Sequence, residues 1–158
     1  MYIIIIIIIV IINNIINLKT KIMAFKASFK FSSGAGANQE LDVLNCNVTF
    51  MRDTDKKGRP SSDIYGGKIV VIVESTPDSI VLENMFAQFK PIGGSIIFKK
   101  ADEDAKMKEL TFENGYIVDY EEGLNVSNDT PMAIRFVISA QKVSLGNAKF
   151  EQNWPEAN

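Results

Sequence analysis

Apolar and polar side chains alternate with a period of two residues along most of the chain. Phenylalanine and alanine alternate with lysine and serine over residues 25–31, and similar alternation recurs over 44–51, 110–120 and 132–138. Such alternation places successive side chains on opposite faces, as in a strand with one buried face. The side chains expected to share one face are Leu44, Cys46, Val48 and Phe50 in one strand, and Leu110, Phe112, Tyr116, Val118 and Tyr120 in another. Beyond Ala140 the apolar positions change parity, which predicts a bulge or bend there.

Residues 69–73 differ from the other predicted strands because they are apolar at every position, Ile-Val-Val-Ile-Val. A strand in a sheet with one solvated face does not need this pattern. Such a strand is covered on its second face by a helix or by another subunit. We therefore predict a subunit interface here, with Val70 and Ile72 as the candidate interface residues.

One segment has helical periodicity. Thr76 is a suitable N-cap, Pro77 suits the first helical position, and Lys90-Pro91 ends the pattern. The apolar stripe, expected to pack in the core, consists of Leu82, Met85, Phe86 and Phe89. Because no second helix of this quality follows, the pattern favours an antiparallel β-barrel of two sheets with one packed α-helix over a parallel βαβ fold.

The first 22 residues do not fit the rest of the chain. All of them except Met1, Val10 and Thr20 can be encoded by codons made only of A and T, and the segment is largely isoleucine and asparagine. Asparagines interrupt the apolar run before it reaches the roughly 20 residues of a membrane helix, and no positive residue precedes it as in a signal peptide. A membrane anchor and a signal peptide remain alternatives, but we expect a misassigned start, with residues 23–158 as one domain.

We therefore predict that translation begins at Met23. Mass spectrometry of the native protein is expected to find an N-terminal peptide that starts at Met23 or Ala24. Recovery of any peptide from residues 1–22 would contradict this prediction.

Composition narrows the possible functions. The chain has no histidine and one cysteine, which excludes Ser-His and Cys-His nucleophile pairs, histidine metal sites and an internal disulfide. The net charge of −2 gives no electrostatic reason to expect a nucleic-acid partner. Residues 53–58 begin like a calcium loop, but Lys57 and Ile64 stand where acidic ligands belong. We predict no catalytic, cofactor-binding or metal-binding residue, and hence no enzyme.

Three stretches together resemble one protein family. They are GRPSSDIYGGKIVVIVESTPDSIVLENMF at 58–86, KKADEDAKMKELTFENGYIVDYEEGLN at 99–125 and PMAIRFVISAQKVSLGNAKFEQNW at 131–154. Their order and spacing are similar to the type VI secretion tube protein, Hcp or TssD, in its Bacteroidetes form. The resemblance implies a barrel with one helix, hexameric rings that stack into a tube, a contractile sheath, a spike protein and effector proteins in the lumen. It also implies a cytoplasmic protein that is secreted through the apparatus, without stable membrane association.

The resemblance further implies that the loop from Arg52 to Gly66 reaches toward the adjacent ring. The candidate stacking residues in this loop are Lys56, Lys57, Arg59, Asp63 and Tyr65. Mixed charge suits a repeated contact between identical rings. The alternative interpretation is a solvated polar hairpin without a partner.

Two other functions stay open at the level of sequence. The many inward aromatic residues also suit a lipocalin-like barrel that binds a small apolar ligand. A phage-tail tube protein would have nearly the same physical features as a secretion tube. A tube subunit should form rings and have a filled core, whereas a ligand carrier should be monomeric and hollow.

Overall fold

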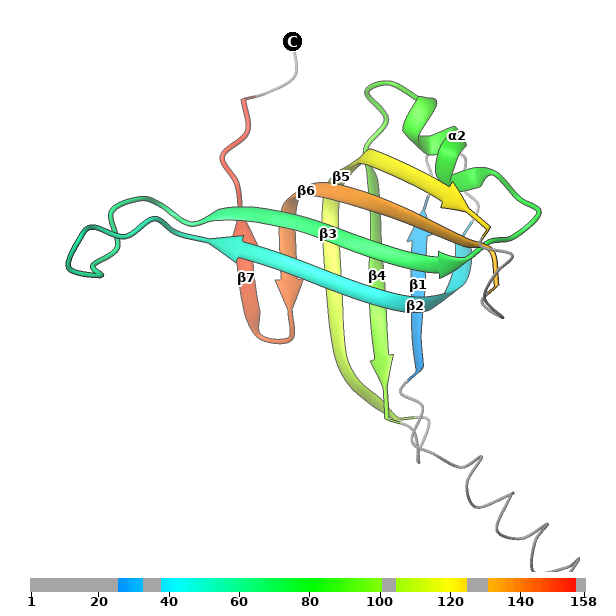
Figure 1. The fold of residues 1–158 in the computed structure, drawn as a ribbon, viewed down its shortest axis with the longest axis horizontal. Helices are drawn as coiled ribbons and strands as arrows, with labels where there is room; N and C mark the ends of the chain where they lie inside the picture. Colours follow the sequence, from blue (N-terminus) through cyan, green and yellow to red (C-terminus); the bar gives the residue numbers. More distant parts are fainter. Residues whose placement is uncertain (1–25, 33–37, 101–104, 125–130, 156–158) are drawn as a thin grey trace, which may run out of the picture.

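The computed structural model describes residues 26–32, 38–100, 105–124 and 131–155. Over these residues the chain forms seven strands and one helix (Figure 1). In chain order they are β1 (Lys26–Ser32), β2 (Asn38–Met51), β3 (Tyr65–Glu74), α2 (Ile80–Phe86), β4 (Ile92–Lys99), β5 (Lys106–Gly123), β6 (Ala133–Leu145) and β7 (Ala148–Glu151).

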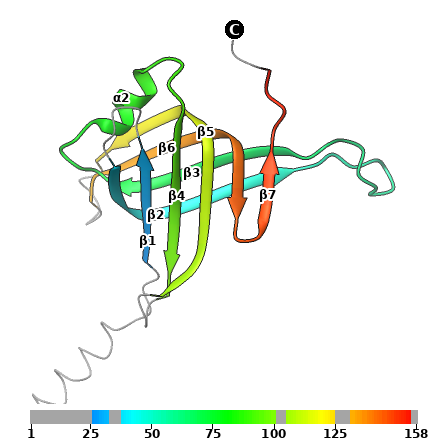
Figure 2. The ribbon, with the colours of Figure 1, turned by 180° about the vertical axis from the view of Figure 1, so that it is seen from behind.

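The strands close into a barrel. Their order is β3-β2-β1-β4-β5-β6-β7, and an additional ladder between β3 and β6 joins the two ends of the first six strands. All of these ladders are antiparallel, which confirms the predicted fold class. Figure 1 shows β2 and β3 in front, and Figure 2 shows β1, β4 and β7 from the opposite side. The helix α2 lies at one end of the barrel.

Aromatic side chains fill the interior of the barrel. Phe29 stacks on Phe31 with ring centroids 5.0 Å apart, and lies 6.1 Å from the ring of Phe112 and 5.5 Å from that of Phe136. Branched aliphatic residues complete the core: Ile69, Val71, Val73, Ile96, Leu110, Ile138 and Val143 are almost completely buried. Burial of this apolar surface is the main force that holds the strands together.

Two glycines make room for the ring of Phe112. A Cβ at Gly94 would lie 2.4 Å from the carbonyl oxygen of Lys30 and 3.0 Å from the ring of Phe112. A Cβ at Gly115 would lie 2.9 Å from both Phe112 and Ile138. The ring therefore occupies space that any larger residue at either position would need.

The predicted inward faces of β2 and β5 are wrong at particular positions. In β2 the register shifts between Val43 and Asn45 and again between Thr49 and Phe50, so that Leu44 and Phe50 are exposed although Cys46 and Val48 pack against the core.

In β5, Asn114 has a positive φ of 50° and the register shifts between Ile117 and Asp119. Gly115 and Ile117 consequently face inward, while Val118 is exposed. In β6 the inward-facing positions change parity beyond Ala140. This change lies beside Asn114 of β5, whose side-chain amide donates a hydrogen bond to the side-chain oxygen of Gln141 at 2.7 Å.

The helix is shorter than predicted. It begins at Ile80 after Ser79, so Thr76 is not its N-cap and Pro77 lies outside it. Its inward side consists of Val81, which is buried, with Ile80 and Met85 packed against the core. Phe86 and Phe89 are exposed, and their predicted place in the core is wrong, because the helix turns the side of Val81 and Met85 toward the barrel and ends at Phe86, before Phe89.

Two strands were not predicted. They are β4, which contains Gly93 and Gly94, and β7, which is only four residues long. The segment 1–22 lies outside the described residues. Within the described residues no helix is long and apolar enough to span a membrane.

Candidate assembly surfaces

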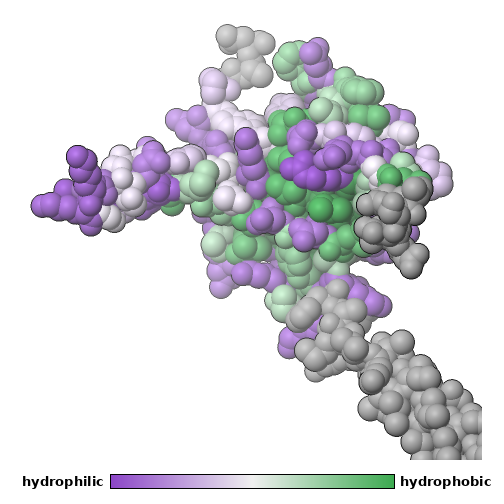
Figure 3. Space-filling view, in the orientation of Figure 1, coloured by the Kyte–Doolittle hydropathy of each residue, from purple (hydrophilic) through white to green (hydrophobic). Residues whose placement is uncertain are grey.

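A hairpin projects from the barrel between β2 and β3. Thr54 bridges to Pro60, and the amide of Ser61 donates to the carbonyl of Asp53 at 2.8 Å, so the two arms pair beyond the end of the sheet. Figure 1 shows this segment extending away from the other strands, and Figure 3 shows that its tip is hydrophilic. The hairpin is thus a structured projection of the molecule.

Asp55 organises the tip of the hairpin. Its carboxylate accepts hydrogen bonds from the amides of Lys57 and Arg59 at 2.8 and 2.9 Å, and from the Arg59 side chain at 2.9 Å. Gly58 takes a φ of 83°, which favours glycine. The bonds from the Arg59 and Lys57 amides lower the pKa of the Asp55 carboxyl. The hydrogen bonds to the Asp55 carboxylate stabilise the folded tip fully at a pH above the ordinary pKa of aspartate. This stabilisation is lost as the pH falls through the lowered pKa of Asp55.

We predict that Asp55→Ala loosens the tip without unfolding the barrel, because it removes three hydrogen bonds confined to the hairpin. Trypsin is expected to cleave after Lys56 and Lys57 several-fold faster in this variant than in the unmodified protein. Asp63→Ala is the control, since no hydrogen bond to the Asp63 carboxylate organises the tip. Equal cleavage of both variants would contradict the role assigned to Asp55.

The C-terminal segment fixes the base of the hairpin. The ring of Phe150 packs edge-on against Phe50 with centroids 5.0 Å apart, and the side-chain amide of Gln152 donates to the carbonyl of Gly66. Gly66 has a φ of 134°, and a Cβ there would lie 2.4 Å from the carbonyl of Thr49. The hairpin therefore leaves the barrel in a direction set by contacts with a segment far away in sequence.

The structure separates the five predicted stacking residues into two groups. Lys56, Lys57 and Asp63 are exposed, and no ion pair within the described residues engages the two lysines. Arg59 pairs with Asp55, and the hydroxyl of Tyr65 donates to Asp53 at 2.8 Å. The first group is available to a partner, whereas Arg59 and Tyr65 maintain the hairpin itself.

Val70 and Ile72 lie on the outer face of β3. Ile69, Val71 and Val73 point into the core, and Val70 and Ile72 are half-buried on the opposite face. On this face Val70 is flanked by Asn47 of β2 and Val137 of β6, and Ile72 by Asn45 and Arg135. Figure 3 shows a hydrophobic area on this side of the molecule with hydrophilic side chains around it.

This face belongs to four strands, β2, β3, β6 and β5, and both of its edges are open. The β1 ladder with β2 covers only Asn38–Asp42, so the stretch 45–51 has no strand beside it on that side among the described residues. The β4 ladder with β5 ends at Gly115, which leaves 116–123 unpaired on that side over the same described part of the chain. Open edges are templates for pairing with another chain.

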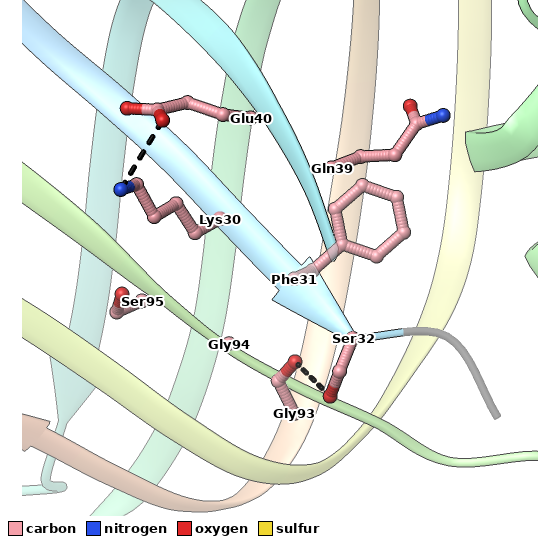
Figure 4. Close-up of a pocket in the computed structure, with 8 residues that line it drawn as sticks. All are labelled: Lys30, Phe31, Ser32, Gln39, Glu40, Gly93, Gly94 and Ser95. Carbon is pink, nitrogen blue, oxygen red and sulfur yellow. Dashed lines mark hydrogen bonds and ion pairs between the residues drawn. The ribbon is translucent and has the colours of Figure 1, made fainter. Parts of the chain in front are cut away.

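The remaining surface offers little for catalysis or ligand binding. The depression in Figure 4, with a volume of about 410 Å³, has a mixed lining, in which Lys30 and Glu40 form an ion pair of 3.1 Å. In the described ranges, which include residues 53–58, no three His, Cys, Asp or Glu residues gather where they could hold a metal ion. Burial raises the pKa of the Cys46 thiol to about 11, which keeps it protonated at neutral pH.

Comparison with known proteins gives one consistent family. The family described as Hemolysin coregulated protein Hcp (TssD) matches residues 23–155, whereas no curated protein matches the chain. Hcp1 from Flavobacterium johnsoniae is 34% identical, with a TM-score of 0.71 over 79% of this chain and 99% of that chain. A mutant Hcp1 from E. coli EAEC 042 has the same fold at 12% identity, with a TM-score of 0.68 over 83% and 99% of the two chains. The chain therefore belongs to the hemolysin coregulated protein family (Hcp, TssD), the tube proteins of type VI secretion systems.

Proposed function

We propose that copies of this chain close into hexameric rings, and that the rings stack into the inner tube of a type VI secretion system. The observation that carries this proposal is the four-stranded face of β2, β3, β6 and β5 with two open edges. Because the two edges belong to different strands, pairing one with the other on a neighbouring copy is heterologous, and heterologous contacts can close a ring. The number six comes from the family.

The surface around Val70 and Ile72 adds to this ring interface. Half-buried apolar residues on an outer sheet face, next to an open edge, are an aggregation liability in a monomer. Cover by a neighbouring copy removes the liability.

The projecting hairpin supplies the contact between rings. The hairpin is long enough to hold Lys56 and Lys57 away from the barrel. In the stacked tube these two side chains contact the neighbouring ring. Each exposed charge pair contributes little, roughly 0–1 kcal/mol. Six copies of the contact between two rings act together, so weak pairs suffice for stacking.

The further partners follow from this role. A contractile sheath surrounds the tube, a spike protein caps it and effector proteins travel in its lumen. The chain acts as a structural protein and not as an enzyme. It is made in the cytoplasm and leaves the cell through the apparatus.

The first test of the proposal is the assembly state of the full chain. Native mass spectrometry and electron microscopy are expected to find hexameric rings and stacked tubes. A protein that stays monomeric at high concentration would contradict the proposed function.

We predict that Lys56→Glu with Lys57→Glu leaves the rings intact and abolishes stacking and secretion. The reason is that both lysines are exposed at the tip and neither maintains the hairpin. Lys108→Glu with Lys149→Glu is the matched control, since it makes the same charge change on exposed strand residues outside the hairpin. Sedimentation distinguishes rings from tubes, and a secretion assay runs in parallel. Loss of the ring itself would place the tip in the subunit interface.

A ligand-binding barrel is the less favoured function. A carrier needs an apolar cavity in the barrel, but here the space between the sheets is occupied by the rings of Phe29, Phe31, Phe112 and Phe136.

A related contractile-injection particle, the anti-feeding prophage baseplate, contains a chain of similar fold at 9% identity and a TM-score of 0.51 over 77% of this chain and 93% of that chain. This likeness concerns the fold alone.

A further inference from the structure

The outer side of α2 presents aromatic side chains to solvent. Phe86 is 74% exposed and Phe89 is 81% exposed, more than any other large apolar side chain in the described residues. Glu83 lies one turn before Phe86 and is also exposed, so that the two share one face of the helix. We call Glu83, Phe86 and Phe89 the helix patch. Neither the ring interface nor the hairpin uses it.

The backbone at Phe89 adds a second, independent observation. Its φ is 61°, and among the described non-glycine residues only Asn114 shares a positive value. Asparagine tolerates this region well, whereas a bulky aromatic residue there is an outlier. In the isolated subunit no packing of the side chain offsets this backbone strain, because the ring of Phe89 points into solvent. Strained residues of this kind are concentrated at functional sites.

The helix patch and the hairpin lie at opposite ends of β3. The hairpin precedes Tyr65, and the segment after Glu74 leads into α2, so ten strand residues, or about 30 Å, separate them. The hydroxyl of Ser75 donates to Glu122, which ties this segment to the end of β5. Figure 1 shows the two features on opposite sides of the molecule. The hairpin of one copy can therefore reach the patch of another only in a head-to-tail arrangement.

The two surfaces are complementary in chemistry. The hairpin offers the ammonium groups of Lys56 and Lys57 at its tip, and exposed apolar side chains at its base from Met51 and Ile64. The helix patch offers the carboxylate of Glu83 beside two aromatic rings. An ammonium group is attracted both by a carboxylate and by the face of an aromatic ring. Asp78 and Glu74, both exposed, add negative charge to the same end of the subunit.

We propose that the helix patch is the docking surface for the β2–β3 hairpin of a second copy of this chain in the adjacent ring. The proposal rests on the stacking function above and deepens it by naming the receptor of the hairpin. It assigns each ring one end with the exposed lysines of the hairpin tip and one end with the acidic, aromatic helix patch. Stacking is then polar, because the hairpin finds its receptor only on the opposite end of the next ring.

The first experiment replaces Phe89 by glycine in the full chain. Phe89→Gly removes the ring and also relieves the positive φ, so the melting temperature of the subunit is expected to stay equal or to rise. Rings are expected to form normally, but the protein concentration needed for stacking should rise about tenfold or more, as for loss of an aromatic hot spot. Met107→Ala is the control, since it trims another exposed apolar side chain at the start of β5 and should leave stacking unchanged.

The second experiment reverses charge on both sides of the contact. Glu83→Lys alone and Lys57→Glu alone are each expected to weaken stacking. The protein that carries both changes is expected to recover stacking to within about threefold of the unmodified protein, because the opposite charges face each other again. Such recovery requires the two residues to meet across rings, and a damaged fold would not produce it.

The outcomes separate this proposal from the proposed function. If the unmodified protein forms no rings, or rings that do not stack, the proposed function fails. If it stacks, but Phe89→Gly stacks equally well and the double charge reversal gives no recovery, the docking surface alone is wrong. Normal stacking of Phe89→Gly together with lost secretion would assign the patch to a different partner and would also overturn the proposal.

Discussion

An aspartate at Val70 or at Ile72 is expected to leave the barrel folded and to abolish the ring. Both side chains point away from the core, so the charge remains solvated in the monomer. If a neighbouring copy covers this face, the charge is buried without a partner, which costs about 3 kcal/mol or more at each interface. That cost weakens each contact by more than about a hundredfold, and the ring contains one such contact per subunit.

Native mass spectrometry of the two variants checks this prediction, with Asn147→Asp as the control. Asn147 is exposed in the turn between β6 and β7, outside this face, so the new charge there should leave the ring intact. Rings that persist with aspartate at both Val70 and Ile72 would show that this face stays open to solvent, and that the ring closes through the strand edges alone.

Gly94→Ala is expected to destabilise the subunit by about 2–3 kcal/mol, the cost of overpacking a well-filled core. The new methyl group would collide with the backbone carbonyl of Lys30, which cannot rotate away, and with the ring of Phe112. Thermal or urea unfolding of the isolated subunit measures the change.

Gly123→Ala is the matched control for this substitution. Gly123 also lies in a strand, but no atom of the described residues approaches within 4 Å of the place of its Cβ, so its replacement should be neutral. Equal stability of the two variants would mean that β1 and β4 separate readily, and that Phe112 is not confined by the glycine.

Strand alternation was sufficient to predict β1, because all inward positions of this short strand are apolar and its neighbours pair with it without irregularity. The same reasoning failed within β2 and β5. In β5 the positive φ at Asn114 reverses the inward and outward positions as far as Ile117, and the bulge at Val118 restores them, so that Tyr120 again packs against the core. Such a bulge depends on how two strands far apart in sequence pair, and alternation along a single strand carries no information on it.

The candidate site was predicted in part. The doubly apolar pattern of 69–73 indicated an outer apolar surface. The projection at 52–66 was expected from the family resemblance, since its polar composition alone also suits a solvated hairpin. The pairing of Arg59 with Asp55 was not predicted, because only the folded hairpin brings its guanidinium to that carboxylate. The helix patch was missed, since Phe86 and Phe89 fit the spacing of a buried stripe. The spacing does not show which side of the helix faces the barrel or that the helix ends at Phe86, since both depend on contacts with distant strands.

By itself the sequence determined the strand-rich class, the single helix, the absence of histidine chemistry and the resemblance to a tube protein. These features depend on residue type and local periodicity, which are properties of short segments. Closure of the barrel through β3 and β6, the open edges of β2 and β5 and the direction of the hairpin were decided only by the tertiary structure. Each of these depends on register and on contacts between distant segments, such as Phe50 with Phe150, which a short segment of sequence does not specify.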